Sequence, residues 1–327
     1  MSLDELVQYQ PEVQCPEDLV EFWTRTVTES RQTADGPTLT RCDAGMTEVV
    51  VDDVTFPGFG GHPIKAWLIR PARHLAGVDA PLPGLVEFLG YGGGRGLPVE
   101  HLWWAASGVA HLVMDTRGQG GHWGTGGETP DPVGRSAGVG GWLTSGIDDP
   151  YEHFYRRMFT DGVRAVDALR SVEGVDAARV SVMGGSQGGG CAIAASALLS
   201  MVGDAPLVTM PDVPFLMHFR RAVQIVDSNP YAEITKWLSI RRDPAVVEAT
   251  WHTLSYLDGA NLARHSVSPA NFSVALMDVT CPPSTVYAAY NAWGTDDKKM
   301  DVYPYNNHEG GGAYRHAEQL GWLRDHL

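Results

Sequence analysis

A serine flanked by glycines is the part of this chain whose residue types suit covalent chemistry. Ser186 lies in residues 182–190 (VMGGSQGGG), which contain the pattern Gly-x-Ser-x-Gly. The preceding residues, 178–183, have the composition of a buried strand, and residues 191–199 form an expected helix of small and apolar residues. A serine on a tight strand-to-helix turn projects its hydroxyl out of the sheet, and the crowded backbone there needs glycine on both sides. The pattern therefore indicates a nucleophile for acyl transfer.

Phosphate binding and simple close packing are also compatible with this turn. A glycine-rich turn before a helix can bind phosphate, although the P-loop ending Gly-Lys-Ser/Thr is absent and the turn has no lysine. A close helix–strand crossing also needs glycine for packing alone. The rest of a catalytic set is required to decide among these three roles.

A nucleophilic serine needs a base, and the base needs an orienting acid. Asp278 follows the strand expected over residues 271–277, and an acid at the carboxyl end of a parallel strand faces the same rim as the serine. Asp212 also follows a strand and is the rival acid, whereas Asp296 and Asp297 precede theirs. The alternative role for Asp278 is to cap the next helix.

The base is expected in the loop after the last strand. His308 lies in residues 305–312 (YNNHEGGG), directly after the strand expected over 299–303. His316 falls inside the terminal helix, where a surface or packing role is expected. Loop position therefore favours His308 as the base.

A tetrahedral intermediate needs preorganised N–H donors. The amide of Gln187, the residue after the serine, is one expected donor. The other is the amide of Tyr91, which has a glycine on each side in the loop 90–96 after the strand 83–89. The alternative for this loop is a tight turn that binds nothing.

The elements that must position these residues alternate between strands and helices from residue 82 onward. This alternation predicts a mainly parallel central sheet flanked by helices on both faces, in one α/β-hydrolase domain over residues 1–327. An N-terminal helix and a hairpin precede this alternating part and form an extension of the domain. Strands are expected at 47–55, 64–70, 83–89, 111–115, 178–183, 206–210, 271–277 and 299–303, and helices at 16–31, 156–172, 283–292 and 313–326.

Two stretches interrupt the alternation. Residues 118–150 are glycine-rich with little periodicity, which indicates an irregular loop that forms an interface or an entrance. Residues 213–262 carry helical segments between two strands, which predicts a helical insertion placed to cap the site.

Composition excludes several function classes. The net charge of −15 over 327 residues disfavours nucleic acid and anionic membranes as partners. Four widely spaced cysteines and no signal-like start predict a cytoplasmic location. Dispersed histidines without His-Glu-x-x-His, and no Gly-x-Gly-x-x-Gly in a first βαβ unit, predict no metal and no cofactor.

Three local patterns together resemble carbohydrate esterase family 7, the acetyl xylan esterase and cephalosporin C deacetylase group. The patterns are Arg117-Gly-Gln119, the serine motif of residues 184–188, and His308-Glu309. The similarity extends over essentially the whole chain. It includes residues 19–23, 161–166, 212–216, 218–222, 229–234, 281–285 and 303–309.

The resemblance implies a complete catalytic set and an assembly. It implies Ser186 as nucleophile, Asp278 as acid and His308 as base, with the Tyr91 and Gln187 amides as oxyanion donors. It also implies a homohexamer whose small entrances admit short acyl groups, and the divergent residues 120–149 leave entrance shape and substrate preference open. Supporting roles are implied for Arg117, Gln119 and Glu309.

The sequence thus predicts a serine esterase that removes acetyl groups from small acetylated carbohydrates such as xylo-oligosaccharides, through an acetyl-enzyme. Cephalosporin C is a further candidate substrate. The first alternative is a serine hydrolase of the same fold that acts on other short esters or amides. The second is a non-catalytic homologue that serves as a scaffold.

Overall fold

The computed structural model describes residues 1–32, 35–72, 80–134 and 140–327. The expected loop 118–150 therefore lies partly outside the described residues. Within them the chain forms one mixed sheet of nine strands in the order β1-β2-β3-β5-β4-β6-β7-β8-β9. The strands are β1 Thr38–Cys42, β2 Val49–Pro57, β3 Pro63–Pro71, β4 Leu82–Phe88, β5 Ala110–Met114, β6 Val175–Gly185, β7 Thr209–Asp212, β8 Ala270–Ala275 and β9 Lys298–Tyr303.

The strand directions divide the sheet into two parts. The pairings β1–β2, β2–β3 and β3–β5 are antiparallel, and every pairing from β5 through β4, β6, β7 and β8 to β9 is parallel. The predicted hairpin is the antiparallel pair β2–β3, and the predicted parallel sheet follows it. Because parallel strands end at one edge, the loops after β4, β6 and β8 meet there.

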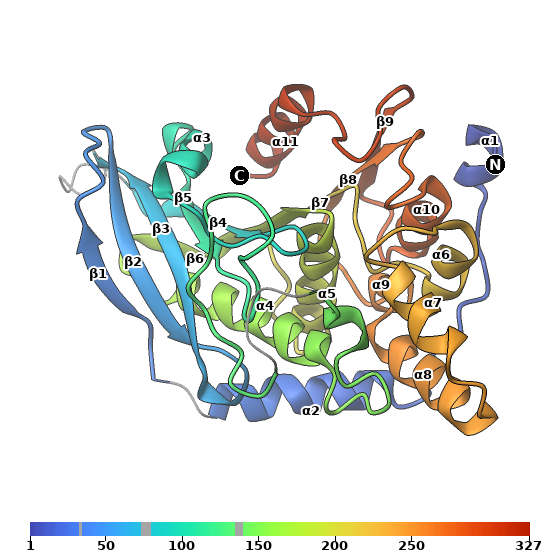
Figure 1. Cartoon of the computed structure of the whole chain (residues 1–327). Coiled ribbons are helices and arrows are strands. Elements are labelled where there is room, and N and C mark those ends of the chain that lie inside the picture. The colour runs from blue at the N-terminus through green and yellow to red at the C-terminus, as the bar shows by residue number, and fades with distance from the viewer. Residues whose placement is uncertain (33–34, 73–79, 135–139) are drawn as a thin grey trace.

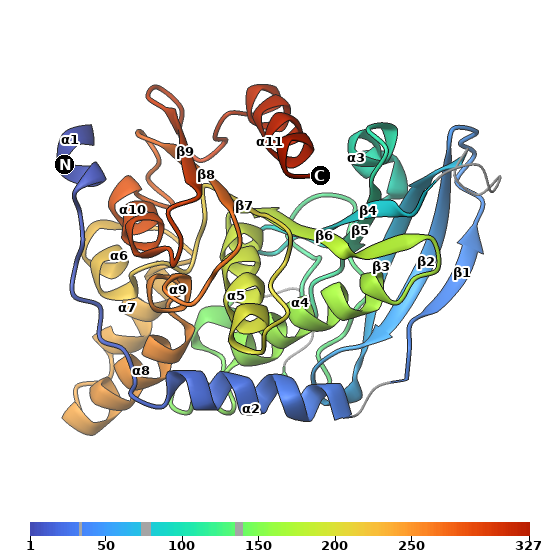
Figure 2. The same cartoon turned by 180° about the vertical axis from the view of Figure 1, so that it is seen from behind.

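Helices cover both faces of this sheet. Figures 1 and 2 show α3 and α11 on one face, and α4 and α5 on the other with α2 packed beneath them. Helices α6 to α9 gather beside the β8–β9 end of the sheet. The helices are α1 Leu3–Val7, α2 Leu19–Gln32, α3 Leu102–Ala106, α4 Phe154–Arg170, α5 Gln187–Met201, α6 Phe219–Ile225, α7 Ala232–Ser239, α8 Pro244–Leu257, α9 Gly259–Ala263, α10 Pro283–Ala292 and α11 Ala313–His326.

The core sits between the sheet and the α4–α5 layer. Helix α5 contributes almost entirely buried small and apolar side chains, which lets it pass close beneath the centre of the sheet. Helix α2 adds Phe22 and Trp23, both fully buried, and the Trp23 indole N–H donates to the Tyr256 carbonyl at 2.9 Å. The rigid layer beneath β6 holds the turn that carries Ser186.

One strand lies further along the chain than its pattern predicts. The apolar run 206–210 predicts the strand, yet β7 is Thr209–Asp212 and includes Pro211. Proline lacks an N–H and is normally excluded from central strands. Strand β7 accommodates it because β7 pairs with β6 along its length but with β8 only at Thr209.

The two interrupted stretches adopt different structures. The segment 213–262 contains the four helices α6 to α9, as the predicted helical insertion requires. The described part of 118–150 is irregular apart from one 3-10 turn, Trp142–Thr144. No helix among the described residues is long and apolar enough to cross a membrane.

Candidate active site

Ser186 sits at a strained turn between β6 and α5. Its φ of 55° is positive, which a non-glycine residue rarely adopts. A Cβ on Gly188 would lie 2.0 Å from the Phe88 carbonyl oxygen, and one on Gly184 would lie 2.4 Å from the Gly188 carbonyl carbon. The glycines therefore meet a steric need at both positions, as the sequence pattern indicates.

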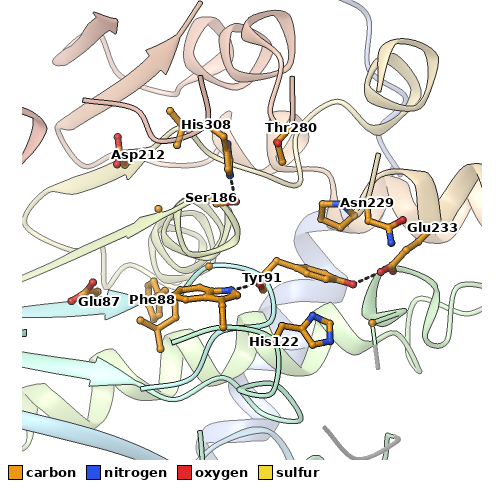
Figure 3. Close-up of a pocket in the computed structure, with 17 residues that line it drawn as sticks. Glu87, Phe88, Tyr91, His122, Ser186, Asp212, Asn229, Glu233, Thr280 and His308 are labelled. Carbon is orange, nitrogen blue, oxygen red and sulfur yellow. Dashed lines mark hydrogen bonds between the residues drawn. The ribbon is translucent and has the colours of Figure 1, made fainter. Parts of the chain in front are cut away.

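Two hydrogen bonds join Ser186, His308 and Asp278 in sequence. His308 Nε2 lies 3.0 Å from Ser186 Oγ (Figure 3). His308 Nδ1 lies 2.8 Å from Asp278 Oδ2. The other Asp278 oxygen accepts the backbone N–H groups of Thr280 and Cys281, both at 2.8 Å. This geometry suits proton transfer from the serine hydroxyl to an imidazole that a buried carboxylate orients.

The rival acid, Asp212, is engaged elsewhere. It accepts a hydrogen bond from the Ser273 hydroxyl and forms an ion pair with Arg315 Nε at 3.3 Å. Its backbone carbonyl accepts the Ser186 N–H at 2.9 Å, so Asp212 braces the turn through its main chain. The structure thus brings Asp278, rather than Asp212, to the His308 ring.

The same corner contains a set of metal-ligand side-chain types. Ligand atoms of Asp278, Cys281 and His308 lie within 4.8 Å of one another, a group found within the described ranges. Cys281 is fully buried, and burial raises the pKa of its thiol well above the usual value, which disfavours the thiolate that metals bind. The carboxylate and the imidazole are already paired, so the group suits proton transfer better than metal binding.

The two predicted oxyanion donors come from segments on either side of Ser186; Tyr91 lines the cavity over the serine, whereas the Gln187 side chain is fully buried. Gln187 is the first residue of α5, so its N–H belongs to the positive end of a helix dipole. Tyr91 follows β4, and its carbonyl accepts the Trp123 indole N–H at 2.7 Å. The loop from Gly90 to Gly96, called the oxyanion loop below, lies beside the serine turn (Figure 3).

Gln119 connects the oxyanion loop to the serine turn. Its side chain exchanges two 3.0 Å hydrogen bonds with the Gln187 carboxamide, and its Oε1 accepts the Gly92 N–H at 2.8 Å. The buried Tyr155 hydroxyl donates to Gln187 Oε1 at 2.9 Å. These contacts fix the residues on both sides of the expected oxyanion position.

Arg117 and Glu309 lie further from the reacting atoms. The Arg117 guanidinium is fully buried, binds Asp161 through two of its nitrogens and reaches Asp131 at 3.3 Å. Glu309 is exposed, and its carboxylate accepts the Asn307 N–H at 3.1 Å within the histidine loop. Neither side chain contacts Ser186, so both act on the scaffold around the site.

A cavity of about 640 Å³ opens over the serine. Figure 3 shows Glu87 and Asp212 on one side of Ser186, and His122, Asn229 and Glu233 on the other. The Tyr91 hydroxyl donates to Glu233 Oε1 at 2.5 Å. The sequence analysis assigns no role to His122, Trp123, Asn229 and Glu233. Asn229 and Glu233 fall in the family-like segment 229–234, whose similarity implies no role for them, and His122 and Trp123 fall in the divergent residues 120–149.

The terminal-helix histidine has the packing role expected of it. The His316 ring stacks on Trp103 of α3 with ring centroids 4.5 Å apart and an interplanar angle of 20°. This contact lies on the face of the sheet that α3 and α11 cover, so His316 belongs to the scaffold.

A serine on a sharp turn after a central parallel strand, with loops from neighbouring strand ends around it, defines the α/β-hydrolase fold. The fold class predicted from the sequence is therefore confirmed. The model of the acetyl xylan esterase family (AXE1) matches residues 1–326, and the chain belongs to that family. The resemblance found in the sequence is thus confirmed as well.

Solved structures and a curated relative agree with this assignment. The acetyl xylan esterase from Paenibacillus sp. R4 is 38% identical with a TM-score of 0.90, and the alignment covers 100% of both chains. Acetyl Xylan Esterase 1 from Thermoanaerobacterium sp. JW/SL YS485 is 31% identical with a TM-score of 0.86, covering 99% of each chain. The acetyl esterase Axe7A of Xylanibacter ruminicola is 27% identical over 188 residues, which span 56% of this chain and only 39% of that relative.

Proposed function

We propose that this protein is a serine esterase that removes acetyl groups from small acetylated carbohydrates. The observation that carries the proposal is the contact of His308 with both Ser186 Oγ, at 3.0 Å, and Asp278 Oδ2, at 2.8 Å, at the floor of an open cavity. Membership of the acetyl xylan esterase family supports an acetyl ester as substrate.

In the proposed mechanism, Ser186 Oγ attacks the ester carbonyl carbon while His308 Nε2 accepts the hydroxyl proton. The tetrahedral oxyanion accepts hydrogen bonds from the Tyr91 and Gln187 backbone N–H groups. His308 then donates its proton to the leaving sugar oxygen, which leaves an acetyl-enzyme. A water molecule, deprotonated by His308, attacks the acetyl carbonyl. His308 returns this proton to Ser186 Oγ as the second tetrahedral intermediate breaks down and releases acetate.

Each supporting residue has a place in this scheme. Asp278 stabilises the imidazolium and holds the ring by its Nδ1. Gln119 fixes the two donor segments relative to each other, and Arg117 holds helix α4 against the loop after β5 through Asp161. Glu309 orders the loop that presents His308.

The first test is acetate release from acetylated xylo-oligosaccharides by wild type and Ser186→Ala. We expect the substitution to lower kcat by about 10⁴-fold or more, because no other group supplies the nucleophile. Ser200→Ala is the matched control, since Ser200 lies on the same helix and donates to the Ser196 carbonyl at 2.7 Å, away from the cavity. Undiminished activity of Ser186→Ala would refute the mechanism.

Two further assays separate the alternatives. A panel of acetyl, butyryl and octanoyl esters with aminoacyl amides is expected to show highest kcat/KM for acetyl esters. Preference for long acyl chains or amides would instead indicate another hydrolase of the same fold. A fluorophosphonate probe should label Ser186 in the folded protein, and failure to label it would favour a non-catalytic scaffold.

The finer parts of the proposal depend on the family resemblance. They are cephalosporin C as a second substrate and a homohexamer as the assembly. The cysteines of the chain are free thiols, which fits the reducing cytoplasm that we propose as its location.

A further inference from the structure

Glu233 reaches from the helical insertion into the cavity and binds three hydrogen-bond donors. Its Oε1 accepts the Tyr91 hydroxyl at 2.5 Å and the Gly141 N–H at 2.9 Å, and its Oε2 accepts the Leu143 N–H at 3.1 Å. The donors come from two loops that are far from α7 in the sequence. One carboxylate therefore ties the insertion to the oxyanion loop and to the loop before α4.

The environment of this carboxylate is unusual for a surface helix. Glu233 is partly buried, and burial raises the pKa of its carboxyl while the bonds from Tyr91, Leu143 and Gly141 oppose that rise. Among the described residues, no lysine or arginine forms an ion pair with it. Burying this carboxylate has a desolvation cost, which the three directed hydrogen bonds offset together with the more distant charge of Lys236.

The Tyr91 side chain is fixed along its whole length. Its ring meets Trp142 edge-on at 4.9 Å between centroids and Phe215 at 6.1 Å, and its hydroxyl ends on Glu233. The backbone around it is intrinsically free, because Gly90 precedes it and Gly92, with a φ of +79°, follows it. A flexible Gly-Tyr-Gly segment can hold one conformation only through such contacts.

Three contacts thus hold the peptide unit that follows Tyr91 and the Tyr91 side chain. Trp123 donates to the Tyr91 carbonyl, Gln119 accepts the Gly92 N–H, and Glu233 accepts the Tyr91 hydroxyl. The first two act on the main chain after Tyr91. The third acts through the side chain and sets the direction of its Cα–Cβ bond. Together the three contacts fix the Tyr91 Cα, and with it the position of the nitrogen that carries the N–H.

We propose that Glu233 is a positioning residue for the oxyanion loop, holding Tyr91 so that its backbone N–H meets the developing oxyanion. The inference rests on the proposed esterase function. It assigns to the helical insertion a part in the chemical step, in addition to its place in the cavity wall.

A donor aimed at the transition state contributes to kcat more than to substrate binding. We therefore expect Tyr91→Phe and Glu233→Gln each to lower kcat on a small acetyl ester about 10-fold with KM nearly unchanged. Glu233→Ala should be lower still, because the Gln variant keeps one carbonyl oxygen as acceptor. The double variant Tyr91→Phe/Glu233→Gln should be less impaired than the product of the single effects, because both remove the same contact.

The controls separate this inference from the proposed function and from general destabilisation. Ser239→Ala changes an exposed residue on the same helix and should leave kcat as in wild type. If wild type and Ser186→Ala hydrolyse acetyl esters equally, the proposed function fails. If they differ but Tyr91→Phe and Glu233→Gln keep wild-type kcat, the positioning role is overturned.

Multiplicative effects in the double variant would also overturn the inference. So would a rise in KM at constant kcat, which would make Glu233 a part of substrate binding. Tyr91→Phe removes a single oxygen atom and retains the packed ring, so it tests the proposal even if Glu233→Ala does not fold. The thermal unfolding midpoint of every variant shows whether a change in kcat accompanies a change in stability.

Discussion

Replacing Gly188 with alanine tests the steric basis of the serine turn. A Cβ at this position would lie 2.0 Å from the Phe88 carbonyl oxygen and 2.6 Å from its carbonyl carbon. Ordinary contact begins at 3.4 Å, and both atoms belong to the backbone of β4, which cannot rotate away as a flexible side chain can. Either the first turn of α5 or the end of β4 must therefore move by about 1 Å or more.

Both possible movements disturb the site as well as the fold. Overpacking of a rigid interior costs about 1–3 kcal/mol, and a backbone neighbour places Gly188→Ala at the upper end, about 3 kcal/mol. A displacement of about 1 Å between the nucleophile and the oxyanion donors lowers kcat about 100-fold. Urea unfolding gives the first quantity, and acetate release from a soluble acetyl ester gives the second.

Gly321→Ala is the matched control. Gly321 lies inside α11, and a Cβ there would meet no atom within 4 Å. This substitution should stabilise the protein by about 0.5–1 kcal/mol, because alanine loses less backbone entropy on folding, and should leave kcat unchanged. If Gly188→Ala unfolds within about 0.5 kcal/mol of wild type and remains fully active, then the close approach of α5 and β4 does not constrain the turn.

Two further predictions concern buried polar groups. Gln119→Leu leaves the Gln187 carboxamide without its amide partner, so we expect kcat/KM for acetyl esters to fall about 10-fold or more, measured beside the unfolding midpoint. Glu87 Oε2 lies 2.9 Å from His111 Nε2 and 3.4 Å from His101 Nδ1. Burial raises the pKa of Glu87, but the two histidines lower it by more, and Glu87 in turn raises the pKa of His101. The contribution of Glu87 to the free energy of unfolding is lost as pH falls below about 4.5, and the contribution of His101 is lost as pH rises above about 6.5. The stability lost in Glu87→Gln, measured by urea unfolding, should therefore be largest between these two pH values. A loss of stability that is independent of pH would contradict the assignment.

The serine turn and the strands around it are predictable from sequence because their signals are local. Gly184 and Gly188 mark a steric requirement within one turn of chain, and Asp278 and His308 each follow an apolar strand. Helices α10 and α11 likewise begin and end where their patterns predict. The catalytic roles themselves stay predictions until the substitutions are measured.

Other elements lack a local signal. Strand β1 is exposed along most of its length and α1 has five residues, so neither shows a buried periodic pattern. Pro211 can lie inside β7 because β8 does not pair with β7 at this residue, so no hydrogen bond is lost for want of an N–H. The sequence alone does not reveal this pairing. Glu233 is separated from Tyr91 by 142 positions, and an acid on a helix usually indicates a solvent-facing side chain.

The shared anchor at Glu233 constrains how this enzyme can be redesigned. A directed-evolution library that enlarges the cavity by varying α7 would also loosen the loop that carries Tyr91, so selectivity and turnover would change together. A library placed at Asn229, which lines the same cavity and whose side-chain oxygen accepts Lys236 Nζ at 3.3 Å, would separate the two traits. The wall of this cavity therefore contains positions that contact the Tyr91 side chain and positions that do not. The choice between them decides whether a change in selectivity is accompanied by a loss of kcat.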